Sequence, residues 1–168
     1  MVSRSTTYDY EQSSEGGRER HEIIPWTRLT DATPTIGDPA EVTGLPIGSQ
    51  MTGTVINPGV AVTDPYAIIN IAKGAVYRHN VRNVITYAGG PVEAAWRVIN
   101  IGDTVYYDPE QDTLNGVKLS LAPLRTDGTT PNTIFGTVVL MQDEDSADYP
   151  KGTAVTPGTT HVCAIDQD

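Results

Sequence analysis

The chain has 168 residues, 38% of them hydrophobic and 7% aromatic, and this size favours one core with a terminal extension over two domains. Its 21 acidic and 11 basic residues give a formal net charge of −10, which disfavours nucleic acid as a partner because the phosphate backbone would be repelled. The single cysteine, Cys163, excludes an intrachain disulfide or a cysteine zinc cage, and no run approaches the roughly 20 apolar residues of a membrane span.

The 16 glycines and 12 prolines favour turns over long helices. We therefore predict an all-β fold, a small turn-rich β-barrel or β-sandwich. Residues 1–30 are expected to form an extended polar arm, and residues 31–168 a single β-domain that ends in an acidic, turn-rich segment. The N-terminus lacks an apolar signal region, so we expect the protein to be made in the cytoplasm.

The arm is polar as far as Glu22, and its only sizeable anchors are Tyr8 and Tyr10. Such a segment buries too little apolar surface to offset its ordering entropy. It is therefore expected either to be disordered or to lie over a neighbouring molecule. The apolar residues Ile23, Ile24 and Trp26 follow directly and could hold the arm down.

The first half of the β-domain reads as short strands between proline and glycine turns. The strands are expected near 41–43 and at 51–56, 60–62, 66–71, 75–78 and 81–87, with a bend near Asn80. The last of these is apolar on both faces, since Val81 and Ile85 alternate with Val84. This pattern is typical of the middle of a sandwich or of a subunit contact that would include Arg82 and Val84.

In the second half, residues 92–99 alternate and place Trp96 inward, and a turn at Gly102 then reverses the chain into a strand at 104–107. We expect these two strands to form a hairpin, followed by a polar loop. A strand at 117–121 would point Lys118 and Ser120 outward. Residues 134–141 form the most apolar strand, and 161–165 a last one.

Catalytic chemistry is not evident in the sequence. The histidines His21, His79 and His161 are far apart and lack the context of a known catalytic motif, and Cys163 lies in an apolar run typical of a buried thiol. The acidic residues at 143–148 and 108–112 lack the spacing of an EF-hand loop, and calcium binding by them stays open. We therefore predict no enzyme, no cofactor and no metal.

Trp96, Tyr106 and Tyr107 could form a platform for a sugar ring. Because adjacent strand residues point to opposite faces, only one of the two tyrosines can lie outside. The more ordinary interpretation is that Trp96 and one tyrosine belong to the core.

Four short motifs occur in a characteristic order: GVAVTD at 59–64, KGAVY at 73–77, IGDTVYYD at 101–108 and FGTV at 135–138. Together they resemble the capsid decoration or cement proteins of tailed bacteriophages, over residues 43–141. The sequence departs from that pattern at Tyr107, where tryptophan is usual, and at Thr137 and Val138, where small residues are usual. The arm lies outside the resemblance.

The resemblance implies a structural virion protein without enzymatic activity, which binds the outer surface of the capsid and bridges neighbouring major capsid proteins. It implies a homo-oligomer on the shell, more readily a trimer than a dimer. We expect no nucleic-acid partner because of the net charge, and no membrane partner because no apolar run is long enough to span one. The alternative is a head-fibre or glycan-binding β-domain for host attachment. The residues expected to contact the capsid or another subunit are Tyr8, Tyr10, Ile23, Ile24, Trp26, Arg82 and Val84.

Overall fold

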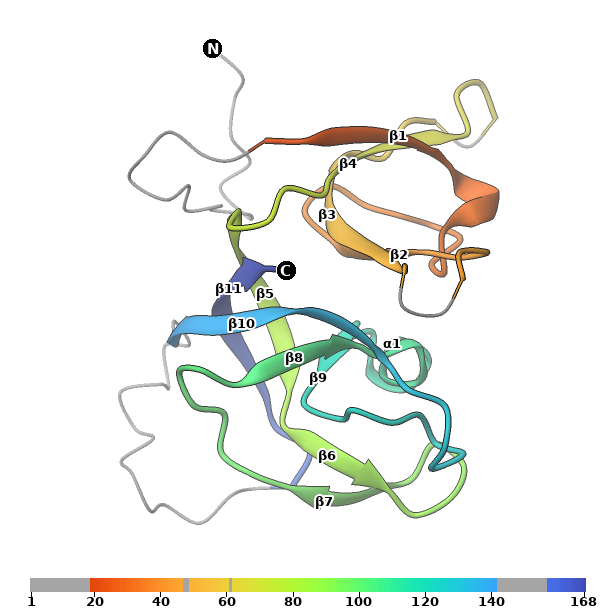
Figure 1. Cartoon of the computed structure of the whole chain (residues 1–168). Helices are drawn as coiled ribbons and strands as arrows, with labels where there is room; N and C mark the ends of the chain where they lie inside the picture. The colour runs from red at the N-terminus through yellow and green to blue at the C-terminus, as the bar shows by residue number, and fades with distance from the viewer. Residues whose placement is uncertain (1–18, 47–48, 61, 142–156) are drawn as a thin grey trace.

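The computed structural model describes residues 19–46, 49–60, 62–141 and 157–168. Two β units are stacked, and the N-terminal sheet lies above a closed barrel in Figure 1. This confirms the all-β prediction and, of its two forms, favours the barrel. Residues 1–18 of the predicted arm lie outside the described residues, as does most of the predicted acidic segment.

The N-terminal sheet has four antiparallel strands in the order β1-β4-β3-β2. They are β1 (His21–Pro25), β2 (Pro39–Val42), β3 (Met51–Asn57) and β4 (Tyr66–Asn70). In β4, Ala67 and Ile69 are fully buried, whereas Tyr66 is exposed, as period-two alternation requires. The predicted arm range therefore contributes a strand to the sheet, since β1 starts at His21.

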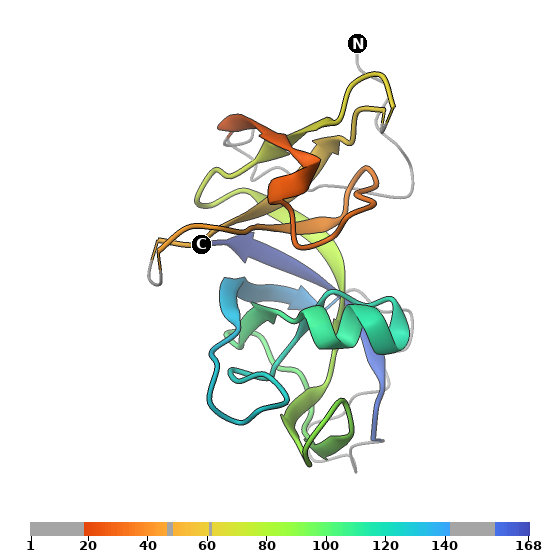
Figure 2. The same ribbon diagram turned by 90° about the vertical axis from the view of Figure 1, so that its right-hand side faces the viewer.

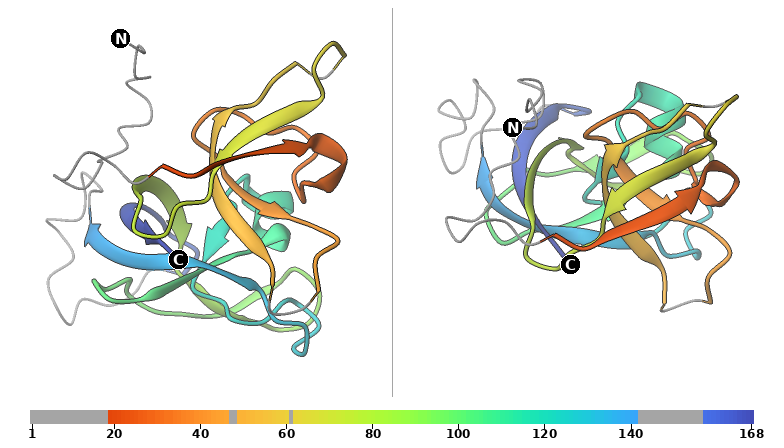
Figure 3. Two further views of the ribbon diagram at one scale, coloured as in Figure 1. Left: turned by 45° about the horizontal axis from the view of Figure 1, so that its top comes forward. Right: turned by 90° about the horizontal axis from the view of Figure 1, so that it is seen from above.

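The two edges of this sheet differ. Along β2, the segment after a short 3-10 helix (η1, Trp26–Arg28) turns back and covers the edge: Leu29 bridges to Val42, and Thr30 donates its backbone N–H to the Glu41 carbonyl at 3.0 Å. At the opposite side, Figure 3 shows β1 beside β4. In the part of the chain that the structure describes, no strand pairs with the outer side of β1.

The barrel closes in the order β10-β11-β5-β9-β8, and only the β5–β9 pair is parallel. Its strands are β5 (Val76–Arg82), β8 (Thr104–Tyr107), β9 (Leu119–Ser120), β10 (Thr133–Met141) and β11 (Thr160–Gln167). A ribbon of β6 (Val84–Tyr87) and β7 (Glu93–Trp96) lies below it. Tyr107, Leu119, Phe135 and Ile165 are fully buried in its core.

The predicted hairpin around Gly102 is wrong, as is the bend near Asn80. β7 pairs with β6, and β8 pairs with β10. The turn at Gly102 is instead held by β10, because the Gly102 N–H donates to the Val138 carbonyl at 2.8 Å. β5 continues through Asn80, and the interruption between β5 and β6 lies at Asn83 instead. Trp96, on the ribbon, is half-buried rather than part of the core.

The predicted polar loop after Tyr107 contains a short helix, α1 (Pro109–Asn115), beside β9 (Figure 2). Asp108 caps it and accepts a hydrogen bond from the Gln111 N–H at 3.3 Å, and Pro109 occupies the first helical position, where its missing N–H costs nothing. Gly116 ends the helix with φ 68°.

The prediction that Lys118 and Ser120 point to solvent is also wrong, because this part of the barrel is covered on its outer side. Ser120 is fully buried and donates its hydroxyl to Asp108 Oδ2 at 2.6 Å. The Lys118 ammonium lies 2.7 Å from both Asp31 Oδ2 and Asp38 Oδ2. Since both aspartates belong to the N-terminal segment, this lysine joins the two β units.

A second polar contact joins the units near the end of β11. Thr54 of β3 donates its hydroxyl to Gln167 Oε1 at 2.5 Å and lies 3.1 Å from Nε2 of His79. Gln167 in turn donates from Nε2 to the Asn70 and Ala72 carbonyls at 3.1 and 3.3 Å. The two β units therefore meet through hydrogen bonds and ion pairs as well as apolar packing.

Candidate functional site

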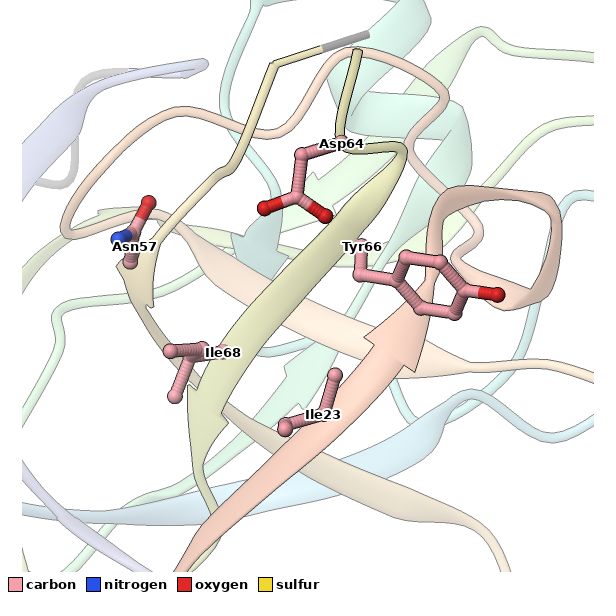
Figure 4. A pocket seen from close by; sticks show the side chains of 5 residues that line it. All are labelled: Ile23, Asn57, Asp64, Tyr66 and Ile68. Carbon is pink, nitrogen blue, oxygen red and sulfur yellow. The ribbon is translucent and has the colours of Figure 1, made fainter.

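A group of apolar side chains lies together on one side of β1 and β4 in the N-terminal sheet. Ile23 of β1 is 69% exposed and lies directly across from Ile68 of β4, and Tyr66 of β4 is 48% exposed. With Asn57 and Asp64 these side chains line a shallow pocket of about 270 Å³ (Figure 4). We call this surface, formed by Ile23, Asn57, Asp64, Tyr66 and Ile68, the outer sheet face.

The loop between β3 and β4 extends this apolar surface. It is closed by paired hydrogen bonds between Val60 and Asp64, at 2.9 and 2.6 Å, and it exposes 58% of Val60 and 93% of Val62. Gly59 begins the loop with φ 70°, and a Cβ there would overlap the Tyr66 and Asp64 carbonyls. Only glycine fits this position. The backbone of the loop therefore explains why the GVAVTD motif begins with a glycine.

Three of the five residues of the outer sheet face are apolar or aromatic, namely Ile23, Tyr66 and Ile68. Asp64 is the charged residue among the five. Several exposed apolar side chains gathered on one sheet are typical of a surface that contacts another macromolecule.

The buried histidine His79 has a structural environment. Its ring lies 5.1 Å from the Phe135 ring, edge to face, and its Nε2 contacts Thr54. Burial lowers the pKa of His79 to about 3, against a smaller opposing effect of Asp38, so the ring is neutral at physiological pH. A neutral imidazole enclosed by a barrel strand and the sheet supports packing between the two β units.

The last two residues of the IGDTVYYD motif also have structural roles. Tyr107 is fully buried, and Asp108 accepts hydrogen bonds from the Tyr87 hydroxyl and from Ser120. Burial raises the pKa of Asp108, opposed by its hydrogen bonds, and burial together with the charge of Asp108 raises the pKa of Tyr87. This network anchors the start of α1 to the barrel.

Metal binding finds no support within the described residues, where no group of three or more histidine, cysteine or carboxylate side chains is arranged around a common point. The acidic residues at 143–148 lie outside that part of the chain. Cys163 is buried, as predicted, and forms no disulfide within the described residues. None of the described helices has the length and apolar character needed to cross a bilayer.

Comparison with protein-family models, with curated proteins and with solved structures finds no match. The resemblance to phage decoration proteins therefore stands on the motifs alone.

Three of the predicted contact residues, Ile23, Trp26 and Arg82, have side chains that are at least partly exposed. Ile23 lies on the outer sheet face, Trp26 is half-buried and donates its Nε1–H to the Pro58 carbonyl at 2.6 Å, and Arg82 forms an ion pair with Glu93 at 2.8 Å.

Ile24 and Val84 face the interior instead. They are 8% and 0% exposed, respectively, so a partner cannot reach their side chains and they do not belong to a contact surface of this structure. Tyr8 and Tyr10 lie outside the described residues. The sequence analysis missed Tyr66 and Ile68, although their alternation with the buried Ala67 and Ile69 was a usable signal.

Proposed function

We propose that this protein is a non-enzymatic structural protein of a phage virion, which binds the outer surface of the capsid and stabilises it. The observation that carries the proposal is the outer sheet face, with Ile23 and Tyr66 exposed on a hydrogen-bonded sheet. Two of the four motifs add support, because Gly59, Gly102 and Asp108 each have a role in a turn or a helix cap and none belongs to a catalytic arrangement.

In this proposal the outer sheet face docks on the major capsid protein, and the arm, which enters the sheet at β1, adds contacts across neighbouring subunits. The net charge of −10 is compatible with a shell that encloses nucleic acid, since such a protein does not compete for the genome. The protein would be made in the host cytoplasm and end on the outer capsid surface.

Binding to assembled shells of the encoding phage tests the proposal. Tyr66→Ser removes an aromatic side chain that is 48% exposed, and we expect it to weaken co-sedimentation with shells by at least about tenfold. Leu124→Ser, on the barrel side of the molecule and 41% exposed, is the matched control and should bind as the unmodified chain does. Equal binding by both variants would overturn the role of the outer sheet face.

The arm is tested separately by deleting residues 1–18, which precede every described strand. We expect the shortened chain to keep its fold, by circular dichroism, and to bind shells more weakly. Undiminished binding would show that the arm does not contribute.

The glycan-binding alternative gains little from the aromatic rings, because Tyr107 is fully buried and the half-buried Trp96 bonds to Glu93 at 3.3 Å.

A further inference from the structure

Among the described residues no strand pairs with the outer edge of β1, and the β1–β4 register shows which backbone groups point toward that edge. The Arg20 carbonyl accepts from the Ile71 N–H at 2.8 Å, and the Trp26 N–H donates to the Pro65 carbonyl at 2.8 Å. In an antiparallel ladder alternate residues face the same neighbour. Even-numbered residues of β1 therefore face β4, and the backbone groups of His21, Ile23 and Pro25 face away from the sheet.

We propose that two copies of this chain associate by antiparallel pairing of their β1 edges about a two-fold axis at Ile23. The two Ile23 residues then exchange both N–H···O=C bonds, and each His21 N–H donates to the Pro25 carbonyl of the second copy. Pro25 lacks an N–H, so each His21 carbonyl stays in solvent. The two four-stranded sheets become one continuous sheet.

Contrast with the other edge supports β1 as the site of association. The β2 edge is already covered by residues of the same chain, through the Leu29–Val42 bridge and the bond from Thr30 to Glu41. The barrel is closed, so each of its five strands has a neighbour on both sides. Exposed edges that natural proteins keep unpaired usually carry charges pointing outward, whereas the outward side chain at the centre of β1 is Ile23, 69% exposed.

The charge around β1 allows a second copy of the chain to pair with this edge. Two chains that each carry −10 repel one another, yet residues 19–28 hold two acidic side chains, Glu19 and Glu22, and two basic ones, Arg20 and Arg28, and are neutral overall. Across the proposed axis the two Glu22 side chains become diagonal neighbours. Each already has its own counter-ion, because Arg20 Nη2 lies 3.6 Å from Glu22 Oε1.

In this pairing Arg20 of one copy lies opposite Trp26 of the other, so the N-terminal end of each β1 lies beside its partner's half-buried tryptophan. Pairing at the edge leaves both outer sheet faces uncovered on the same side. The inference does not depend on the capsid proposal, and it favours a closed pair over the expected trimer, because each β1 edge is used up by one neighbour.

The first test is the mass of the full chain in solution, without shells, by light scattering after size exclusion. We expect the mass of the 18.0 kDa chain to double as concentration rises. Ile23→Lys places two like charges at the axis and should return the mass to one chain. Ile101→Lys is the control, since Ile101 is 64% exposed on a barrel turn, and it should not change association.

A cross-link then tests the register. In a hydrogen-bonded antiparallel pair the Cα atoms lie about 5.5 Å apart, within the span of a disulfide. Ile23→Cys should therefore form a reducible dimer under mild oxidation much faster than Ile101→Cys, while the native Cys163 is buried and does not compete.

The inference is wrong if the unmodified chain has the mass of a monomer at its highest soluble concentration. It is also wrong if association survives Ile23→Lys, or if the two cysteine variants cross-link equally. Because Ile23 is an exposed side chain, neither substitution removes core packing, and circular dichroism confirms that each variant is folded. Failure of shell binding with intact pairing would refute the capsid proposal alone.

Discussion

Replacing Lys118 by methionine should loosen the joint between the two β units. The ammonium lies 2.7 Å from both Asp31 and Asp38, and its side chain is 12% exposed, against 13% and 19% for the two aspartates. Lys118→Met keeps most of the stem that packs in the joint. It leaves two carboxylates close together without a cation, in a region that water reaches poorly.

The expected cost lies between two limits. Breaking a fully buried ion pair costs about 3–5 kcal/mol, and a solvent-exposed pair contributes about 0–1 kcal/mol. Because the three side chains keep a little exposure, we expect a loss of about 3 kcal/mol at pH 7. For a chain of this size, that corresponds to a fall of about 6–12 °C in the melting temperature.

The pH dependence identifies the cause. Burial opposes ionisation of Asp31, but the hydrogen bond and charge of Lys118 and the Thr33 N–H outweigh it, and the pKa of Asp31 is lowered. A carboxyl group with a lowered pKa stabilises the fold above its unfolded value of 3.8 and loses that contribution as the pH falls through the folded value. The penalty of Lys118→Met should therefore be larger at pH 7 than at pH 3.

Thermal unfolding followed by circular dichroism at both pH values measures this difference. Lys73→Met is the matched control, because it removes the same charge from an exposed position. It should lower the melting temperature little at either pH. An equal penalty for Lys118→Met at pH 7 and pH 3 would refute the electrostatic reasoning and assign the loss to packing.

Two further substitutions test the barrel. Tyr87→Phe removes a hydroxyl that donates to the buried Asp108, and should cost about 1–3 kcal/mol in urea unfolding, so an unchanged midpoint would contradict the role of this bond. Gly136→Ala places a Cβ against the Asp166 carbonyl of β11, where backbone must move, and should cost about 3 kcal/mol; a loss below about 0.5 kcal/mol in the same assay would show that the ladder adapts.

Much of the fold could be predicted because strands with one buried face have a period of two. Residues 51–56 and 66–71 agree with β3 and β4 to within a residue or two, and Cys163 lies inside β11 as its apolar surroundings indicated. The helix after Asp108 was missed because seven residues are too few to show apolar periodicity. Its capping aspartate and following proline were nevertheless visible signals.

Pairing could not be predicted in the same way. The turn at Gly102 suggested a hairpin because neighbouring strands often pair. Instead β7 pairs with the strand before it, β6, and β8 pairs with β10, which starts only at Thr133. The prediction of which side chains are exposed was wrong where a second layer covers a strand. Lys118 and Ser120 follow an alternating pattern, yet Lys118 meets the aspartates of the N-terminal segment and Ser120 meets Asp108. A single sequence does not show such long-range contacts.

The antiparallel register of β1 and β4 has a mechanical consequence. The arm enters β1 at His21, which lies opposite Asn70, and the chain leaves β4 for the barrel at the same end. A pull between arm and barrel therefore loads the strand pair at one end and separates it rung by rung, beginning with the 2.8 Å bond between Ile71 and Arg20. Under such a pull the strand pair would open one hydrogen bond at a time instead of sharing the load among all of its bonds, and so act as a weak link under tension.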